Sequence, residues 1–256
     1  MIIAQIYSTL EGEIIMCYLD IHSHILPGVD DGPHSDEQSK HMLEIAYQEG
    51  FKSIVVTPHY QEGVYSHSID FLKVKLDELT KYIHDKGLDI QLLLGSEIFY
   101  SHGIIDLLNA KRLPTLAESR YVLIEFIPSA DYRYIKNGLN QLQLEGYLPI
   151  LAHVERYREL KKDLSKVKEL VDMGIYLQVN AMSIDGSNGL KDSLFTHKLL
   201  RNNCVHFLAT DCHSDRTRAP RITKAVNIIT KKYGGAYKDK LLIDNPMQIL
   251  ANQYID

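Results

Sequence analysis

The sequence predicts an α/β fold in which parallel strands alternate with helices, as in a barrel or a doubly wound sheet. Three observations support this. Short apolar segments recur along the chain, at 18–21, 53–57, 91–95, 121–126, 149–152, 175–179 and 206–209. Segments with helical spacing of apolar residues lie between them. Several of these helical segments end in a glycine just before the next strand, as at Gly50, Gly87, Gly146 and Gly174.

The predicted helices follow the strands in order and leave only short connections. They span 36–49, 69–86, 134–145, 160–173, 190–202 and 219–233, and a final helix at 244–253 caps the chain. No linker, low-complexity tract or repeat interrupts this pattern, so we expect one domain over residues 16–256. Residues 1–15 precede the first strong strand, and they are either an added N-terminal extension or the product of a mis-set start codon.

Composition and charge exclude several classes of protein. Of the 256 residues, 45% are hydrophobic and 24% are charged, which is typical of a globular protein. The net charge of -5, without a basic run, argues against nucleic acid as a partner. No apolar segment is long enough to span a membrane. Three cysteines without a repeated spacing fit a reducing compartment, so we expect a cytoplasmic protein.

Histidine and carboxylate side chains follow six of the seven predicted strands. In either parallel architecture these strand ends meet at one rim, where functional groups gather. His-x-His places two imidazoles on one face of a strand, so both can reach one ion. The candidate ligands are His22, His24, Asp31, His59, Glu97, Glu125, His153, Asp211 and His213.

So many ligands exceed the needs of one ion, and imidazoles with carboxylates suit manganese, iron or zinc. A multinuclear site is therefore predicted, in which shared carboxylates help to clamp a phosphate and activate water. Each residue also has an ordinary interpretation, because a single strand-end histidine is more often a packing residue. Glu125, set among apolar neighbours, could be compensated by an arginine as well as by a metal.

The ordered motifs identify a family resemblance. DIHSHILPGVDDG, VVTPHY, LIEF, LAHVERY and ATDCHSDRTR resemble the PHP (polymerase and histidinol phosphatase) superfamily, from about residue 18 to the C-terminus. Within it they are similar to the bacterial metal-dependent protein-tyrosine phosphatases of capsule and exopolysaccharide operons. The resemblance implies a single-domain, distorted seven-stranded (β/α)7 TIM-like barrel with three divalent metal ions, usually manganese. An N-terminal extension departs from the family pattern.

The resemblance also assigns ligands and substrate-binding residues. One metal would take His22, His24, Glu97 and Asp211; a second would share Glu97 and add Glu125 and His153; a third would take Asp31, His59 and His213. Asp31 matches the ligand position better than Asp30, which is expected to support the loop, although Asp30 could also ligate. Arg156 and Arg218 match the arginines that bind phosphate, and Arg216 is a weaker match.

The expected reaction is direct hydrolysis of phosphotyrosine, without a phosphoenzyme. The resemblance implies that the protein substrate is the C-terminal tail of a cognate tyrosine autokinase that regulates polysaccharide synthesis. The loops 61–68 and 127–134, with Tyr60, Tyr65, Tyr132 and Tyr134, could form an aromatic rim or could be ordinary loop tyrosines.

Three alternatives remain open at this point. Cys212 and Arg218 match the Cys-x5-Arg signature of thiolate phosphatases, but no glycine lies between them, and Asp211 would oppose thiolate formation. A second alternative is a PHP-type small-molecule phosphoesterase such as histidinol-phosphatase. The third is a binding module with a vestigial site, against which the complete ligand set argues.

Overall fold

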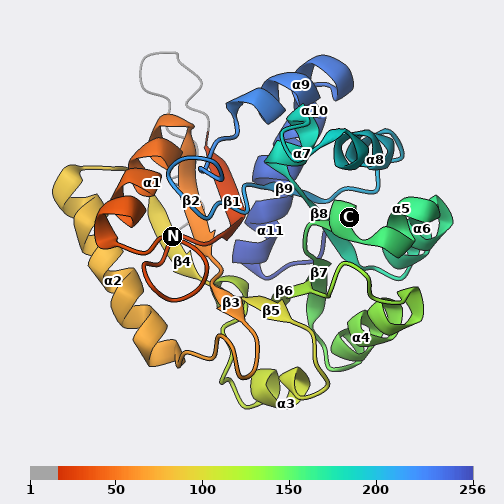
Figure 1. Cartoon of the computed structure of the whole chain (residues 1–256), viewed down its shortest axis with the longest axis horizontal. Helices are drawn as coiled ribbons and strands as arrows, with labels where there is room; N and C mark the ends of the chain where they lie inside the picture. The colour runs from red at the N-terminus through yellow and green to blue at the C-terminus, as the bar shows by residue number, and fades with distance from the viewer. Residues whose placement is uncertain (1–16, 256) are drawn as a thin grey trace.

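The computed structural model describes residues 17–255, so the predicted extension at 1–15 lies outside the described residues. The strands lie inside a ring of helices (Figure 1). They are β1 (Tyr18–Ser23), β2 (Phe51–Val56), β3 (His59–Tyr60), β4 (Gln91–Leu94), β5 (Glu97–Phe99), β6 (Tyr121–Glu125), β7 (Leu148–Leu151), β8 (Tyr176–Asn180) and β9 (Phe207–Ala209). Neighbouring strands pair in parallel, which confirms the predicted α/β class.

The strands form two sheets rather than one continuous seven-stranded sheet. The orders are β1-β2-β4 and β3-β5-β6-β7-β8-β9. Strands β2 and β4 belong to the first sheet. Each is followed, after a short break, by a short strand of the second sheet, β3 and β5 respectively. Pro58 stands in the break between β2 and β3, where it cannot donate a ladder hydrogen bond. Gly95 stands between β4 and β5, where an added Cβ would lie 2.8 Å from Leu116 and 2.9 Å from Val55.

Backbone hydrogen bonds connect the two sheets beyond the ends of β1 and β9. The amide of Asp211 donates to the carbonyl of His22 at 2.9 Å, and the amide of His24 donates to the carbonyl of Cys212 at 2.9 Å. Ser23 and Cys212 form an isolated parallel bridge. The parallel sheets therefore curl into one α/β domain, and the segments that carry His-x-His and Asp-x-His are held side by side.

The helices pack around the curl; the longer ones lie close to their predicted positions, whereas the short helices at 104–109, 181–185 and 235–239 were not predicted. The helices are α1 (Asp36–Gln48), α2 (Ile69–Lys86), α3 (Ile104–Asn109), α4 (Tyr132–Leu144), α5 (Arg158–Lys162), α6 (Leu164–Asp172), α7 (Ala181–Asp185), α8 (Leu190–Arg201), α9 (Thr223–Tyr233), α10 (Gly235–Asp239) and α11 (Asn245–Ala251). The predicted helix at 160–173 is divided at Asp163, which is extended and caps α6 by accepting from the amide of Ser165. None of the helices in residues 17–255 is both long and apolar enough to cross a bilayer.

Side-chain alternation separates the apolar interior of the curl from the polar rim. Along β6, Tyr121 and Leu123 belong to the inner apolar cluster, and Glu125 follows on the same face at the carboxyl end. Along β8, Tyr176 belongs to that cluster, and Gln178 follows two residues later. A larger apolar cluster fills the space between strands and helices. In both β6 and β8 the inward-facing side chains are apolar at first and polar at the carboxyl end. The carboxyl-end rim is polar for this reason.

Candidate metal centre

The predicted ligands converge at the carboxyl ends of the strands. Within residues 17–255, three groups of side chains place their ligand atoms within 4.8 Å of one another. They are His22, His24, Glu97 and Asp211; His24, Asp31, His59 and His213; and His59, Glu97 and Glu125. His153 lies beside the third group, with Nε2 2.7 Å from Glu97 Oε1 and 3.5 Å from Glu125 Oε2.

Glu97 lies at the centre of the cluster and is fully buried. Its Oε2 atom lies 3.1 Å from an imidazole nitrogen of each of His22, His24 and His59. None of these contacts has hydrogen-bond geometry, so this buried oxygen has no hydrogen-bond partner among the described residues. An uncompensated buried carboxylate is costly, and a divalent cation would compensate it. The donor set therefore fits metal ions of the predicted kind.

Hydrogen bonds on the far side of the His22 and His24 imidazoles fix which nitrogen faces the cluster. Gln178 Oε1 accepts from the backbone amide of His153 at 2.8 Å and lies 3.2 Å from His22 Nδ1. His24 Nδ1 lies 2.7 Å from Asp30 Oδ2. Both Nδ1 atoms are therefore placed to donate, which leaves the Nε2 lone pairs toward the cluster, as metal-ligating histidines require.

Asp30 supports the ligand loop, and Asp31 points into the cluster. Asp30 accepts from the amides of His59 at 3.0 Å and Gly32 at 2.9 Å, in addition to its contact with His24. Asp31 Oδ1 lies 3.1 Å from His213 Nε2 and 3.4 Å from His59 Nε2. The Asp31 side chain is 52% exposed, so the otherwise buried cluster opens to solvent on this side.

Two residues of β8, which are not among the predicted ligands, orient the cluster. Gln178 Nε2 donates to Asn180 Oδ1 at 2.8 Å, and Asn180 Nδ2 donates to Asp211 Oδ2 at 2.7 Å. Their spacing by two along a strand is the sequence signal that could have identified them, because it places both on the inner face. This amide chain connects His22 to Asp211.

Two of the predicted ligands have left-handed backbones immediately beyond strand ends. His153 has φ 33° and Asp211 has φ 51°. Such conformations are uncommon for residues with a side chain, cost about 1–3 kcal/mol each, and cluster at functional sites. They turn both side chains into the rim, and sequence periodicity does not reveal them.

The cluster keeps its carboxylates ionised. Burial alone would raise the pKa of Glu97, but His22 and His59 hold that pKa well below its ordinary value. Burial likewise opposes ionisation of Asp211, but His22 and the neighbouring arginines lower its pKa. Hydrogen bonding by His213 and His59 lowers the pKa of Asp31. Ionised carboxylates are the form that binds divalent metals.

Arg156 and Arg218 both contact Asp211 from the edge of the cluster. One nitrogen of Arg156 lies 2.5 Å from Asp211 Oδ2, and one nitrogen of Arg218 lies 2.9 Å from Asp211 Oδ1. Their side chains are 33% and 34% exposed, so the remaining N–H donors are open to a ligand. Arg216, the weaker match, is exposed and donates no side-chain hydrogen bond within residues 17–255. Two cationic forks thus adjoin the metal cluster, which suits a phosphate.

Cys212 is placed unfavourably for a thiolate nucleophile. Its side chain is fully buried. Burial, reinforced by Asp20 and Asp211, raises the pKa of the thiol well above its ordinary value. A nucleophilic cysteine needs the opposite, an accessible thiol with a lowered pKa. The Cys-x5-Arg spacing is therefore a coincidence of sequence.

Comparison with known proteins shows the family of the chain. Residues 18–251 match the family model for capsular polysaccharide synthesis, CpsB/CapC. Tyrosine-protein phosphatase CpsB of Streptococcus pneumoniae is 37% identical over 93% of this chain and all of that protein. Tyrosine-protein phosphatase YwqE of Bacillus subtilis is 32% identical over 93% of both.

A solved structure has the same fold. It comes from crystal structures of Bacillus subtilis YwqE and Streptococcus pneumoniae CpsB, described as unique metal-dependent tyrosine phosphatases. The TM-score is 0.88 at 32% identity, with 93% of this chain and 96% of that chain covered. The family resemblance predicted from the motifs is thereby confirmed: this chain belongs to the CpsB/CapC family of capsular polysaccharide synthesis proteins.

Proposed function

We propose that this protein is a metal-dependent protein-tyrosine phosphatase that hydrolyses phosphotyrosine directly. The observation that carries the proposal is the buried Glu97 Oε2, which three imidazole nitrogens approach at 3.1 Å, beside two partly exposed arginines. The names of the relatives, which are tyrosine-protein phosphatases at 32–37% identity, support the same reaction.

Three divalent metal ions are proposed to bind, most readily manganese, with iron and zinc as alternatives. When bound, they polarise the phosphate and activate the attacking water. The proposed ligands are His22, His24, Asp31, His59, Glu97, Glu125, His153, Asp211 and His213. Glu97 would serve two of these ions, because its two carboxylate oxygens face different groups of nitrogens.

Arg156 and Arg218 are proposed to hold the phosphate oxygens that face away from the metals. Forked N–H donors match these oxygens and stabilise the charge that develops as the leaving oxygen departs. Asp211 would keep both guanidiniums in place through its ion pairs with them. A tyrosyl leaving group, with a reference pKa of about 10, needs less help from a general acid than an alkyl alcohol does.

The remaining finer assignments follow from the family resemblance. We propose that the two curled sheets are parts of one distorted seven-stranded barrel of the PHP type, supported by the backbone bonds between Asp211 and His22. The proposed substrate is the C-terminal tail of a bacterial tyrosine kinase that controls capsule or exopolysaccharide synthesis. A cytoplasmic location is proposed because the three cysteines of the sequence have no repeated spacing.

The test combines metal analysis with turnover. The purified protein is assayed for bound metals and for hydrolysis of a phosphotyrosine peptide, before chelation and after manganese, zinc or iron is restored. We expect stoichiometric metal, loss of activity on chelation, and recovery with at least one ion. Faster turnover of histidinol phosphate than of the peptide would instead favour the small-molecule alternative, and comparable turnover of phosphoserine peptides would contradict tyrosine specificity.

A further inference from the structure

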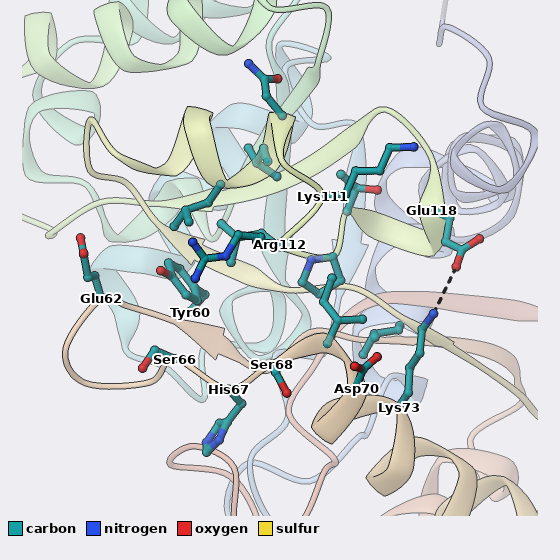
Figure 2. Close-up of a pocket in the computed structure, with 18 of the residues that line it drawn as sticks. Tyr60, Glu62, Ser66, His67, Ser68, Asp70, Lys73, Lys111, Arg112 and Glu118 are labelled. Carbon is teal, nitrogen blue, oxygen red and sulfur yellow. Dashed lines mark ion pairs between the residues drawn. The ribbon is translucent and has the colours of Figure 1, made fainter.

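A cleft of about 1190 Å³ has none of the proposed metal ligands in its lining. Figure 2 shows residues that line it. Its walls are the loop 61–68, the first turn of α2 and the segment 107–119. The cleft exists because the connection between β5 and β6 contains only the six-residue helix α3, which leaves part of the outer face uncovered. Its volume exceeds the roughly 300–1,000 Å³ of typical small-molecule pockets, so an extended chain is a better match for it.

The cleft and the metal cluster share one wall. His59 and Tyr60 are adjacent in β3, so they face opposite sides; His59 joins the cluster and Tyr60 lines the cleft. The Tyr65 ring stacks on the His59 ring, with centroids 5.8 Å apart and planes inclined by 18°. His67, which follows on the cleft side, donates from Nε2 to the carbonyl of Val29 at 2.8 Å. The loop 61–68 is thus held by the Tyr65 ring on the side of the metal cluster and by His67 on the side of the cleft.

Six charged residues line the cleft: Glu62, Asp70, Lys73, Lys111, Arg112 and Glu118. At one end, Lys73 and Glu118 form an ion pair at 3.9 Å. Toward the other end, Arg112 lies beside Tyr60 (Figure 2), and its positive charge acts on the Tyr60 hydroxyl. Arg112 has no ion pair within residues 17–255, and Glu62 stands at the edge of the cleft (Figure 2). Arg112 is therefore an exposed cation beside Tyr60, the neighbour of His59 in β3.

The floor between these charges is apolar, formed by Leu94, Leu107, Leu108, Leu113 and Pro114. Most of the rest of the lining is polar, so the cleft offers apolar contacts and polar or charged partners side by side. An extended polypeptide satisfies both features, because its side chains supply apolar and acidic groups at short intervals.

We propose that this cleft binds the polypeptide segment next to the phosphotyrosine of a protein substrate, with an acidic side chain of that segment on Arg112. The inference rests on the proposed function, since it assigns a peptide-binding site to the same reaction. The cleft would then select phosphotyrosines in acidic surroundings, whereas the metal cluster would act on any aryl phosphate that reaches it.

The experiment compares three substrates on the full-length, metal-loaded protein. They are p-nitrophenyl phosphate, a phosphotyrosine peptide with glutamates flanking the phosphotyrosine, and the same peptide with lysines there. For Arg112→Glu we expect kcat/KM of the glutamate peptide to fall about fivefold, as for a rim ion pair. For the same variant, kcat/KM of the lysine peptide should rise, and kcat/KM of p-nitrophenyl phosphate should stay unchanged. Arg201→Glu, with the same charge change at the far end of α8, should leave all three unchanged.

The possible results separate this inference from the proposed function. Arg112→Glu could leave kcat/KM of both peptides unchanged, or lower kcat/KM of all three substrates equally. Either result would show that the peptide does not bind in the cleft, while leaving the proposed phosphatase function intact. If the metal-loaded wild-type protein hydrolyses none of the three, the proposed function is wrong and the inference falls with it. Reversed peptide preference with unchanged p-nitrophenyl phosphate turnover would support both.

Discussion

The Nε2 atoms of His22 and His24 lie 3.1 Å apart at the centre of the rim. Because Gln178 and Asp30 contact the opposite Nδ1 atoms, two lone pairs face each other in a buried space. Such a contact is unfavourable unless a cation or a proton lies between the nitrogens, and Glu97 Oε2 lies 3.1 Å from both. The proposed metal binding at this point would explain why the two nitrogens and the carboxylate oxygen are held so close together.

Glu97→Gln should weaken metal binding and abolish most activity. The amide keeps the shape but removes the charge that two ions are proposed to share. Even residues outside the coordination sphere change affinity or activity by about 10–100-fold, so we expect a loss of at least about 100-fold in turnover. Manganese should raise the melting temperature of the wild type but not of the variant, since only a bound ligand stabilises. Glu78→Gln, an exposed control, should match the wild type in both measurements.

Removing either of the arginines proposed to bind phosphate should lower turnover strongly. Arg156→Met or Arg218→Met removes a charged fork, and loss of one such donor typically costs about 10²–10³ in kcat. Arg216→Met provides the matched control, because it lies in the same loop and is exposed, and it should retain activity within about twofold. Equal losses of turnover in Arg216→Met and Arg218→Met would contradict the proposal that Arg218 binds the phosphate.

Cys212→Ser should leave turnover nearly unchanged. The thiol is buried and its pKa is raised, so it supplies no nucleophile. We expect a cost in stability of about 1–3 kcal/mol from burying a hydroxyl, measured by denaturant unfolding, with kcat/KM almost preserved. A loss comparable to that of Glu97→Gln, in a folded protein with normal metal content, would restore the thiolate mechanism.

Gly138→Ala should destabilise the protein although alanine favours helices. An added Cβ in α4 would lie 2.6–2.9 Å from ring atoms of Tyr100, which is buried and donates to Gln141 at 2.9 Å. Overpacking of this kind costs about 1–3 kcal/mol, more than the roughly 1 kcal/mol gained in helix propensity. Gly103→Ala is the control, because a Cβ added there would meet no neighbouring atom within 4 Å. Thermal melting of both variants tests the comparison.

Sequence patterns predicted the rim because strand ends and polar residues coincide. His22 and His24, or Asp211 and His213, lie two apart, and spacing by two places side chains on one face whatever the tertiary detail. Parallel strands then bring their carboxyl ends together. The family resemblance, rather than spacing, assigned Asp31 to the cluster, and the geometry places it there.

Other features depend on long-range packing, which periodicity does not encode. The break between the sheets depends on how Pro58 and Gly95 meet neighbouring strands. The left-handed backbone of His153 is imposed by the rim around it. Helices α3, α7 and α10, of five or six residues, are shorter than the window in which helical spacing can be recognised.

Stability should fall in mild acid partly through His206. Burial, with Lys240 nearby, lowers the pKa of this imidazole from 6.5 to about 4, and its Nδ1 accepts from the amide of Leu177 at 3.0 Å. Above pH 6.5 His206 is neutral in both the folded and the unfolded state, so it does not contribute to the pH dependence of the free energy of unfolding. As pH falls toward 4, the unfolded chain binds a proton that the folded protein does not, so folding is progressively disfavoured.

The expected loss is roughly 3 kcal/mol by pH 4, from about 1.36 kcal/mol per pKa unit. His206→Asn keeps an acceptor for the Leu177 amide but does not titrate. Denaturant unfolding of wild type and variant between pH 7 and pH 4 isolates this residue, because the metal cluster is common to both proteins. The wild-type free energy of unfolding should fall more steeply than that of the variant below pH 6.5. Parallel curves would show that His206 is protonated as readily in the folded protein as in the unfolded chain.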